Sequence, residues 1–160
     1  MENLRNPPLD ATDGALLAQL ERDARTTNAD LAAVAGIAAS TTHARVRALE
    51  ARGVVRGYHA SVDQAALGRG LQAIIGVTLR PGSRQESITA FAENVRRLPQ
   101  VIQAFFVGGS DDFLVHVAVE DSSALRAMVV DHISGQPSVA STRTSVIFAY
   151  QRSAVVAEFD

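Results

Sequence analysis

A short helix with a marked beginning and a marked end is the sequence feature that most constrains the fold of this chain. Thr27 supplies a hydroxyl at the N-cap position, and Asp30 supplies a carboxylate three residues later, which resembles a capping box. Gly36 then permits the sharp turn that a following helix needs. We therefore predict a helix over 28–35 that turns into a further helix beginning near Ala39, as in a helix-turn-helix unit.

The helix after this turn has two different faces. Thr42, Val46 and Leu49 share one face at helical periodicity, which predicts that this face packs inward, and Gly53 marks the end of the helix. The opposite face is small, hydroxylated and basic, so it can lie in a groove of DNA and donate hydrogen bonds to phosphates and base edges. Leucines at helical spacing predict a first helix over 11–24.

Positive charge is concentrated around this helix. The whole chain has 15 basic and 17 acidic residues, a net charge of −2, which argues against a nonspecific nucleic-acid coat protein. Residues 36–60 nevertheless contain arginines at four positions against the single acid Glu50. A solvated helix face also carries arginines, so the turn and the capped helix before it decide in favour of DNA. The candidate DNA-contacting residues are Ser40, Thr41, Thr42, His43, Arg45, Arg47 and Arg52.

These candidates have different expected roles. We expect Ser40, Thr41 and Arg47 to meet base edges or nearby phosphates. Arg45 and Arg52 flank that surface, and we expect them to position the helix on the DNA backbone.

The rest of the chain alternates strands and helices. An extended strand is predicted over 54–62, directly after Gly53. The order that follows is β-α-β-β-α-β, which predicts a split βαβ fold in which four antiparallel strands carry two helices on one face. The predicted strands are 71–79, 101–107, 112–119 and 141–149, and the predicted helices are 85–98 and 122–133.

The predicted sheet is apolar on both faces. In the first strand, the alternating apolar residues define one face, but Ile74 places an apolar side chain on the opposite face. Phe106 does the same in the second strand. Both faces are therefore expected to be buried, and the simplest cover for the second face is another copy of the sheet. We expect at least a homodimer.

A glycine-rich turn connects two of the predicted strands. Gly and Asp residues between 108 and 112 are ordinary in a hairpin turn, because such turns need positive φ angles. The same turn is rich in backbone N–H groups that can bind a carboxylate, and Asp112 can pair with an ammonium group. Thr142 and Thr144 share one face of their strand and could close such a pocket, although threonines are also good strand formers. The candidate effector-binding residues are Val107, Gly108, Gly109, Ser110, Asp112, Thr142 and Thr144.

Several classes of protein are disfavoured by the composition. The chain has no cysteine, so it has no disulfide, no thiolate metal site and no cysteine nucleophile. No apolar run approaches the roughly 20 residues of a membrane helix, and no apolar signal core opens the chain, so we expect a cytoplasmic protein. The four histidines are scattered, which predicts neither a metal site nor a catalytic triad. We expect no cofactor other than an amino-acid effector.

The order of these elements and the residues at their joints resemble the Lrp/AsnC (feast/famine) family of transcriptional regulators. The resemblance extends from Leu9 to about Arg152. It is carried by Leu9-Asp10-Ala11-Thr12-Asp13, Gly36-Ile37, Arg45-Val46-Arg47-Ala48-Leu49-Glu50, Gly53-Val54-Val55, Gly57-Tyr58, Gly108-Gly109-Ser110-Asp111-Asp112-Phe113-Leu114 and Thr142-Arg143-Thr144.

The resemblance implies both a fold and a function. The fold is α+β: a helix-turn-helix (winged-helix-like) DNA-binding domain, 1–53, a linker strand and hinge, 54–70, and a ferredoxin-like effector and oligomerisation domain, 71–160. It also implies dimers that pair through their sheets and often assemble as an octamer, with an amino acid bound between neighbouring dimers. The chain departs from the family at Ala38, where a serine commonly caps the recognition helix, and at Ser110, where an aspartate is common.

The function expected from these features is sequence-specific binding of double-stranded DNA, regulated by an amino acid or a related small metabolite. Two alternatives stay open. One is an enzyme like the sirohaem decarboxylases, which resemble this family in fold and would recruit His43 or His116. The other is an effector-binding assembly module that does not bind DNA.

Overall fold

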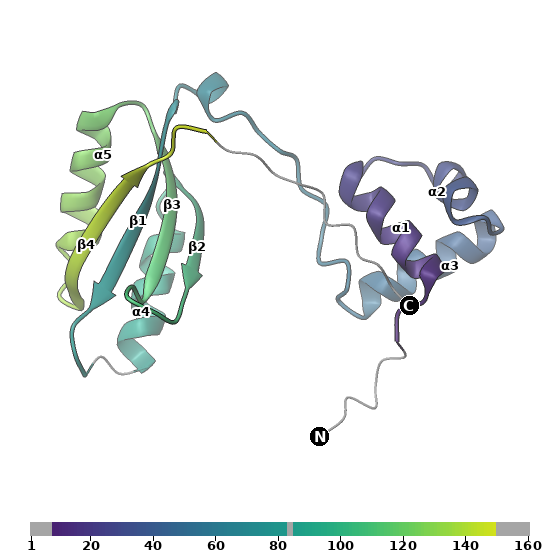
Figure 1. Ribbon diagram of the computed structural model, residues 1–160, viewed down its shortest axis with the longest axis horizontal. Helices are drawn as coiled ribbons and strands as arrows, with labels where there is room; N and C mark the ends of the chain where they lie inside the picture. The colour runs from purple at the N-terminus through teal and green to yellow at the C-terminus, as the bar shows by residue number, and fades with distance from the viewer. Residues whose placement is uncertain (1–7, 83–84, 150–160) are drawn as a thin grey trace. The chain divides into compact units, whose positions relative to one another are not determined.

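The structure is a computed structural model that describes residues 8–82 and 85–149. The described chain divides into two compact units, and the division lies between Ser61 and Val62, inside the predicted linker 54–70 (Figure 1). The first unit is helical, and the second contains the only sheet of the described residues.

Three helices make up the first unit: α1 (Ala11–Arg22), α2 (Asn28–Ala35) and α3 (Ala39–Ala51). Leu16, Leu20 and Leu31 form the core that joins α1 to α2. Val46 of α3 packs against this core, and Leu49 is 1% exposed. The predicted inward face of α3 is therefore confirmed.

Local hydrogen bonds set the ends of these helices. The Thr27 hydroxyl accepts from the Asp30 amide, and Gly36 has φ 66°, so both predicted signals of α2 are confirmed. At the end of α3 the Gly53 amide donates to Glu50 and the Val54 amide to Leu49, which is a Schellman motif. α1 ends two residues before the predicted position, because Asp23 is extended and its carboxylate accepts from the Arg25 amide instead of continuing the helix.

The strand predicted over 54–62 is wrong, since the described part of this segment forms no ladder. The amides of Val54 and Val55 donate back to the Leu49 carbonyl, and the Val55 side chain packs on the leucine core. Further along, the Tyr58 hydroxyl donates to Glu50 at 2.9 Å. The apolar residues of this segment thus serve the first unit, and a strand also needs a partner strand, which the segment lacks within the described chain.

The second unit has the predicted β-α-β-β-α-β order. The strands are β1 (Leu71–Leu79), β2 (Val101–Phe106), β3 (Phe113–Val119) and β4 (Val139–Val146), and the sheet order is β2-β3-β1-β4. All three neighbouring pairs are antiparallel, as predicted. The helices are α4 (Gln85–Arg96) and α5 (Ser122–Met128), preceded in the chain by a short 3-10 helix, η1 (Ala65–Leu67).

Both helices cover one face of this sheet. Ile75, Val77, Val115 and Val117 are fully buried on that face, and Phe91 of α4 packs there against the strands. The opposite face carries Ile74, Leu114 and Phe105 from three adjacent strands, and Phe105 is 49% exposed.

The predicted helix over 122–133 changes its winding halfway. It is α-helical only to Met128 and continues as a π-helix, η2 (Val129–Ser134). The Gly135 amide donates to Val130, five residues back, and this wider winding keeps Ile133 fully buried in the core. β4 begins earlier than predicted because Val139 pairs with Leu79 of β1, and it ends at Val146 rather than at residue 149.

Candidate DNA-binding face and effector turn

The outer face of α3 is exposed, and several of its side chains are small. Ser40, Thr41, His43 and Arg47 are all solvent-exposed on the helix, and Ala44 between them adds no bulk. Within residues 8–82 and 85–149, Arg47 forms no ion pair. Its guanidinium is therefore available to an external anion. α3 begins at Ala39, and its N-cap residue Ala38 makes no side-chain hydrogen bond, so the amides of the first turn have no side-chain cap from that residue.

Thr42 was wrongly included among the DNA-contacting residues. Its side chain is 0% exposed, and its hydroxyl donates to the Ala38 carbonyl at 3.1 Å. A side chain buried against the rest of the unit cannot reach a groove of DNA. The role of Thr42 is to anchor the uncapped start of α3.

Replacing Thr42 with valine should lower the stability of the first unit without changing DNA contacts. The valine keeps the shape but loses the hydrogen bond to Ala38, which costs about 1 kcal/mol. Chemical unfolding followed by helical circular dichroism measures this loss, and Thr41→Val, on the exposed face, is the matched control. Weaker DNA binding by Thr42→Val with unchanged unfolding would contradict the buried role.

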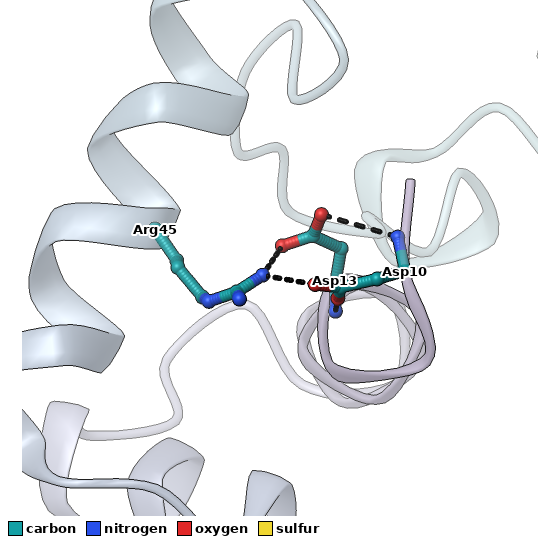
Figure 2. A network of polar contacts seen from close by, with 3 residues as sticks. All are labelled: Asp10, Asp13 and Arg45. Carbon is teal, nitrogen blue, oxygen red and sulfur yellow. Dashed lines mark hydrogen bonds and ion pairs between the residues drawn. The ribbon is translucent and has the colours of Figure 1, made fainter. Parts of the chain in front are cut away.

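Arg45 lies on the side of α3 that faces α1 (Figure 2). One of its guanidinium nitrogens, Nη1, lies 2.8 Å from Asp10 Oδ2 and 2.8 Å from Asp13 Oδ1. The Asp13 amide and then Arg45 hold the pKa of Asp10 below its ordinary value, and the hydrogen bonds to Asp10 and Asp13 raise the pKa of Arg45. Asp10 and Arg45 are therefore charged at neutral pH, and the arginine predicted to bind the DNA backbone is already paired.

The remaining arginines of this region differ in exposure. Arg52 is the C-cap residue of α3, half-buried, with contacts of its own inside the chain. Arg56 follows the helix and is exposed, although it was not among the predicted contacts. Of the predicted arginines, Arg47 is thus the one with an exposed, unpaired side chain in the described structure.

The predicted effector turn connects β2 to β3. The Val107 amide donates to the Asp112 carbonyl, which closes the turn, and the exposed residues Gly108, Gly109 and Ser110 form its tip. The Asp112 carboxylate accepts from the Leu79 amide at 2.7 Å through Oδ2. One of the two carboxylate oxygens of Asp112, the residue predicted to pair with an ammonium group, is therefore already bonded to the backbone of β1.

A buried carboxylate in this turn was missed by the sequence analysis. Asp111 is 9% exposed and pairs with Arg143 of β4 at 2.5 Å. It lies over Gly76 of β1, where a Cβ atom would come within 2.8 Å of Asp111 Oδ1. Gly76 pairs with Arg143 in the register of the sheet. The glycine within an otherwise apolar strand was the available signal, because glycine inside a strand often marks close approach of another group.

Thr142 and Thr144 do not join the turn within one chain. In the sheet register they lie opposite Val77 and Ile75, which belong to the helix-covered face, and Thr142 shares a 3.1 Å hydrogen bond with Ser134 of η2. Arg143, between them, projects from the other face. The two threonines do share a face, but the structure places them apart from Asp111.

The histidines considered for an enzyme belong to separate units. His43 is exposed on α3, whereas His116 lies on the open face of the sheet, 2.9 Å from Gln72 Oε1, and burial lowers its pKa. No group of metal-binding residues forms among the described residues. In the same ranges, no helix is long and apolar enough to span a membrane.

Comparison with known proteins gives one consistent result. Residues 72–153 match the Lrp/AsnC ligand-binding domain, and residues 9–56 match a winged helix-turn-helix DNA-binding family. The HTH-type transcriptional regulator AldR of Mycolicibacterium smegmatis is 43% identical over 96% of this chain and 89% of its own length. AldR of Mycobacterium tuberculosis is 42% identical, over 96% of this chain and 85% of its own. A transcriptional regulator of Neisseria meningitidis, solved in complex with L-Met, has a TM-score of 0.84 at 28% identity and covers 94% of this chain and 97% of its own.

Proposed function

Since this chain belongs to the Lrp/AsnC family of DNA-binding transcriptional regulators, we propose that it reads double-stranded DNA with the outer face of α3 and responds to an amino acid or a related small metabolite. The observation that carries the DNA-binding part is the exposed surface of Ser40, Thr41, His43 and Arg47 on a helix whose other face is buried. Small side chains let the helix approach base edges, and the hydroxyls and the guanidinium donate hydrogen bonds. Arg52, the C-cap residue of this helix, stays a proposed contact to the DNA backbone. The protein acts where its DNA lies, in the cytoplasm.

A selection from random duplexes tests the DNA-binding part. The full chain should recover a recurrent sequence from a random pool, and it should bind the recovered duplex more tightly than a scrambled one at each salt concentration. Recovery of no preferred sequence, with no binding to any duplex, would leave only an effector-binding assembly module.

The proposed effector site includes the turn at 107–112. Exposed backbone at Gly108, Gly109 and Ser110 can donate to a carboxylate, and the free oxygen of Asp112 can accept from an ammonium group. Two further observations favour an amino acid: the second unit matches a ligand-binding family, and a relative of similar fold was solved with L-Met.

Calorimetric titration with a panel of amino acids tests this site. We expect one or a few amino acids to bind the wild-type chain and Asp112→Asn to bind them at least tenfold more weakly. Asparagine keeps an oxygen that can accept from the Leu79 amide but removes the charge, so the turn is retained. Equal binding by both proteins, or binding by neither, would refute the role of Asp112.

We further propose that the open face of the sheet pairs with a second copy, and that the dimers assemble into an octamer. Phe105, Ile74 and Leu114 form an apolar surface there, and no described residue of the chain covers it fully. A symmetric dimer buries the same patch on both partners. Sedimentation of wild type against Phe105→Glu tests this pairing; wild type should be a multiple of dimers and the variant smaller. A monomeric wild type would contradict the proposal.

A further inference from the structure

Arg45 connects the middle of α3 to the beginning of α1. Its Nη1 donates to Asp10 Oδ2 and Asp13 Oδ1, both at 2.8 Å, so a single nitrogen bridges two carboxylates (Figure 2). The Asp13 side chain is only 9% exposed, and that of Arg45 is 35% exposed. The Asp10 side chain is 51% exposed, so the network is buried at Asp13 and open to solvent at Asp10.

The same two carboxylates also begin α1. The Asp13 amide donates to Asp10 Oδ1 at 2.8 Å, and the Asp10 amide donates to Asp13 Oδ2 at 3.4 Å, which is a reciprocal capping box. Arg45 therefore binds the capped end of α1 and not a single flexible side chain. The angle at which α3 lies on α1 is fixed by this contact together with the leucine core.

Arg45 and Arg47 project from different sides of α3. Residues two apart on an α-helix point to nearly opposite sides. Arg45 faces α1, and the exposed guanidinium of Arg47 faces away from it. To reach DNA at the outer face of α3, where Arg47 points, the Arg45 guanidinium would have to leave both carboxylates, and the buried Asp13 would then lose its ion pair, which is costly.

We propose that Arg45 is a positioning residue of the DNA-binding unit: it holds the recognition helix on the N-terminus of α1 through Asp10 and Asp13, and it does not bind DNA itself. This inference rests on the proposed function of α3. It also gives Arg45 an electrostatic effect, because its positive charge offsets one of the two negative charges of Asp10 and Asp13 in the unit that must approach phosphates.

Salt dependence of binding distinguishes positioning from contact. Each phosphate contact that is lost reduces the slope of log K against log salt by about 1. Arg45→Gln, measured in the full chain on the duplex recovered from the random pool, should bind about fivefold more weakly with an unchanged slope. Arg47→Ala, measured beside it, should lower the slope by about 1 if Arg47 contacts a phosphate, and should abolish the preference over the scrambled duplex if it contacts a base edge. A lower slope in Arg45→Gln would overturn the assignment, and so would binding equal to wild type.

A double-mutant cycle that combines Arg45→Gln with Asp10→Asn tests whether Arg45 acts through Asp10. Asparagine is as good an N-cap as aspartate, so α1 keeps its beginning while the charge is removed. The loss caused by Arg45→Gln should shrink to about twofold in this background, because the two residues act together. Additive effects on DNA binding would contradict the positioning role.

If Arg45→Gln does not fold, as judged by its circular dichroism, Asp10→Asn decides alone. Positioning predicts an unchanged salt slope for Asp10→Asn, whereas an arginine released to a phosphate would steepen the slope. Failure of the wild-type chain to prefer any duplex would instead overturn the proposed function of α3, which separates the two claims.

Discussion

Replacing Gly76 with alanine should abolish the amino-acid response and destabilise the second unit while leaving the first unit folded. The new Cβ atom would lie 2.8 Å from Asp111 Oδ1 and 2.9 Å from Asp111 Cγ, closer than van der Waals contact allows. Asp111 must therefore move and loosen its ion pair with Arg143. Overpacking of this kind costs about 1–3 kcal/mol. Moving Asp111 also displaces its neighbour Asp112 in the effector turn.

Thermal unfolding and calorimetric titration measure the two effects of Gly76→Ala. Gly108→Ala is the control for stability, because nothing lies within 4 Å of a Cβ atom there and the unfolding temperature should stay unchanged. Adding Asp111→Ala to Gly76→Ala removes the clashing carboxylate and should recover part of the lost stability. Normal unfolding together with normal amino-acid binding in Gly76→Ala would show that the turn does not depend on this packing.

Replacing Arg47 with alanine should reduce affinity for the recovered duplex about tenfold, as expected for the loss of one arginine contact of roughly 1–3 kcal/mol. Arg47 is the predicted arginine whose side chain is exposed and unpaired in the described structure. If it contacts a base edge, the preference over a scrambled duplex disappears; if it contacts a phosphate, both affinities fall alike.

Fluorescence anisotropy on both duplexes measures the effect of Arg47→Ala. Arg97→Ala is the matched control, since it removes the same charge from an exposed position in the second unit. We expect the control to bind like wild type. Equal affinities for Arg47→Ala, Arg97→Ala and wild type would remove Arg47 from the interface.

The elements with strong local signals were predicted accurately. α2 has both predicted boundaries, because the Thr27 hydroxyl and the positive φ of Gly36 act on their own neighbours in the chain. β1 spans the predicted residues, since a long alternating apolar run is buried almost regardless of its partners. The antiparallel order of the sheet followed from these elements because few topologies connect them.

The errors arose where distant residues decide the structure. The segment 54–62 has strand-like composition, yet its amides bond back to α3. The pairing of Arg45 was not predicted, because its partners, Asp10 and Asp13, lie more than thirty positions earlier. Asp111, in the turn between β2 and β3, was overlooked because its burial depends on Gly76 of β1. Thr42 was placed on the packing face by its periodicity, and its burial shows that this periodicity should have excluded it from the DNA contacts.

The most direct test of the central claim is recovery of DNA bound to this protein across its native genome, with and without each candidate amino acid. A DNA-reading, amino-acid-responsive regulator should be recovered at discrete sites that share one sequence, and occupancy of these sites should change with one or a few amino acids. Uniform recovery along the genome that no amino acid alters would contradict the account.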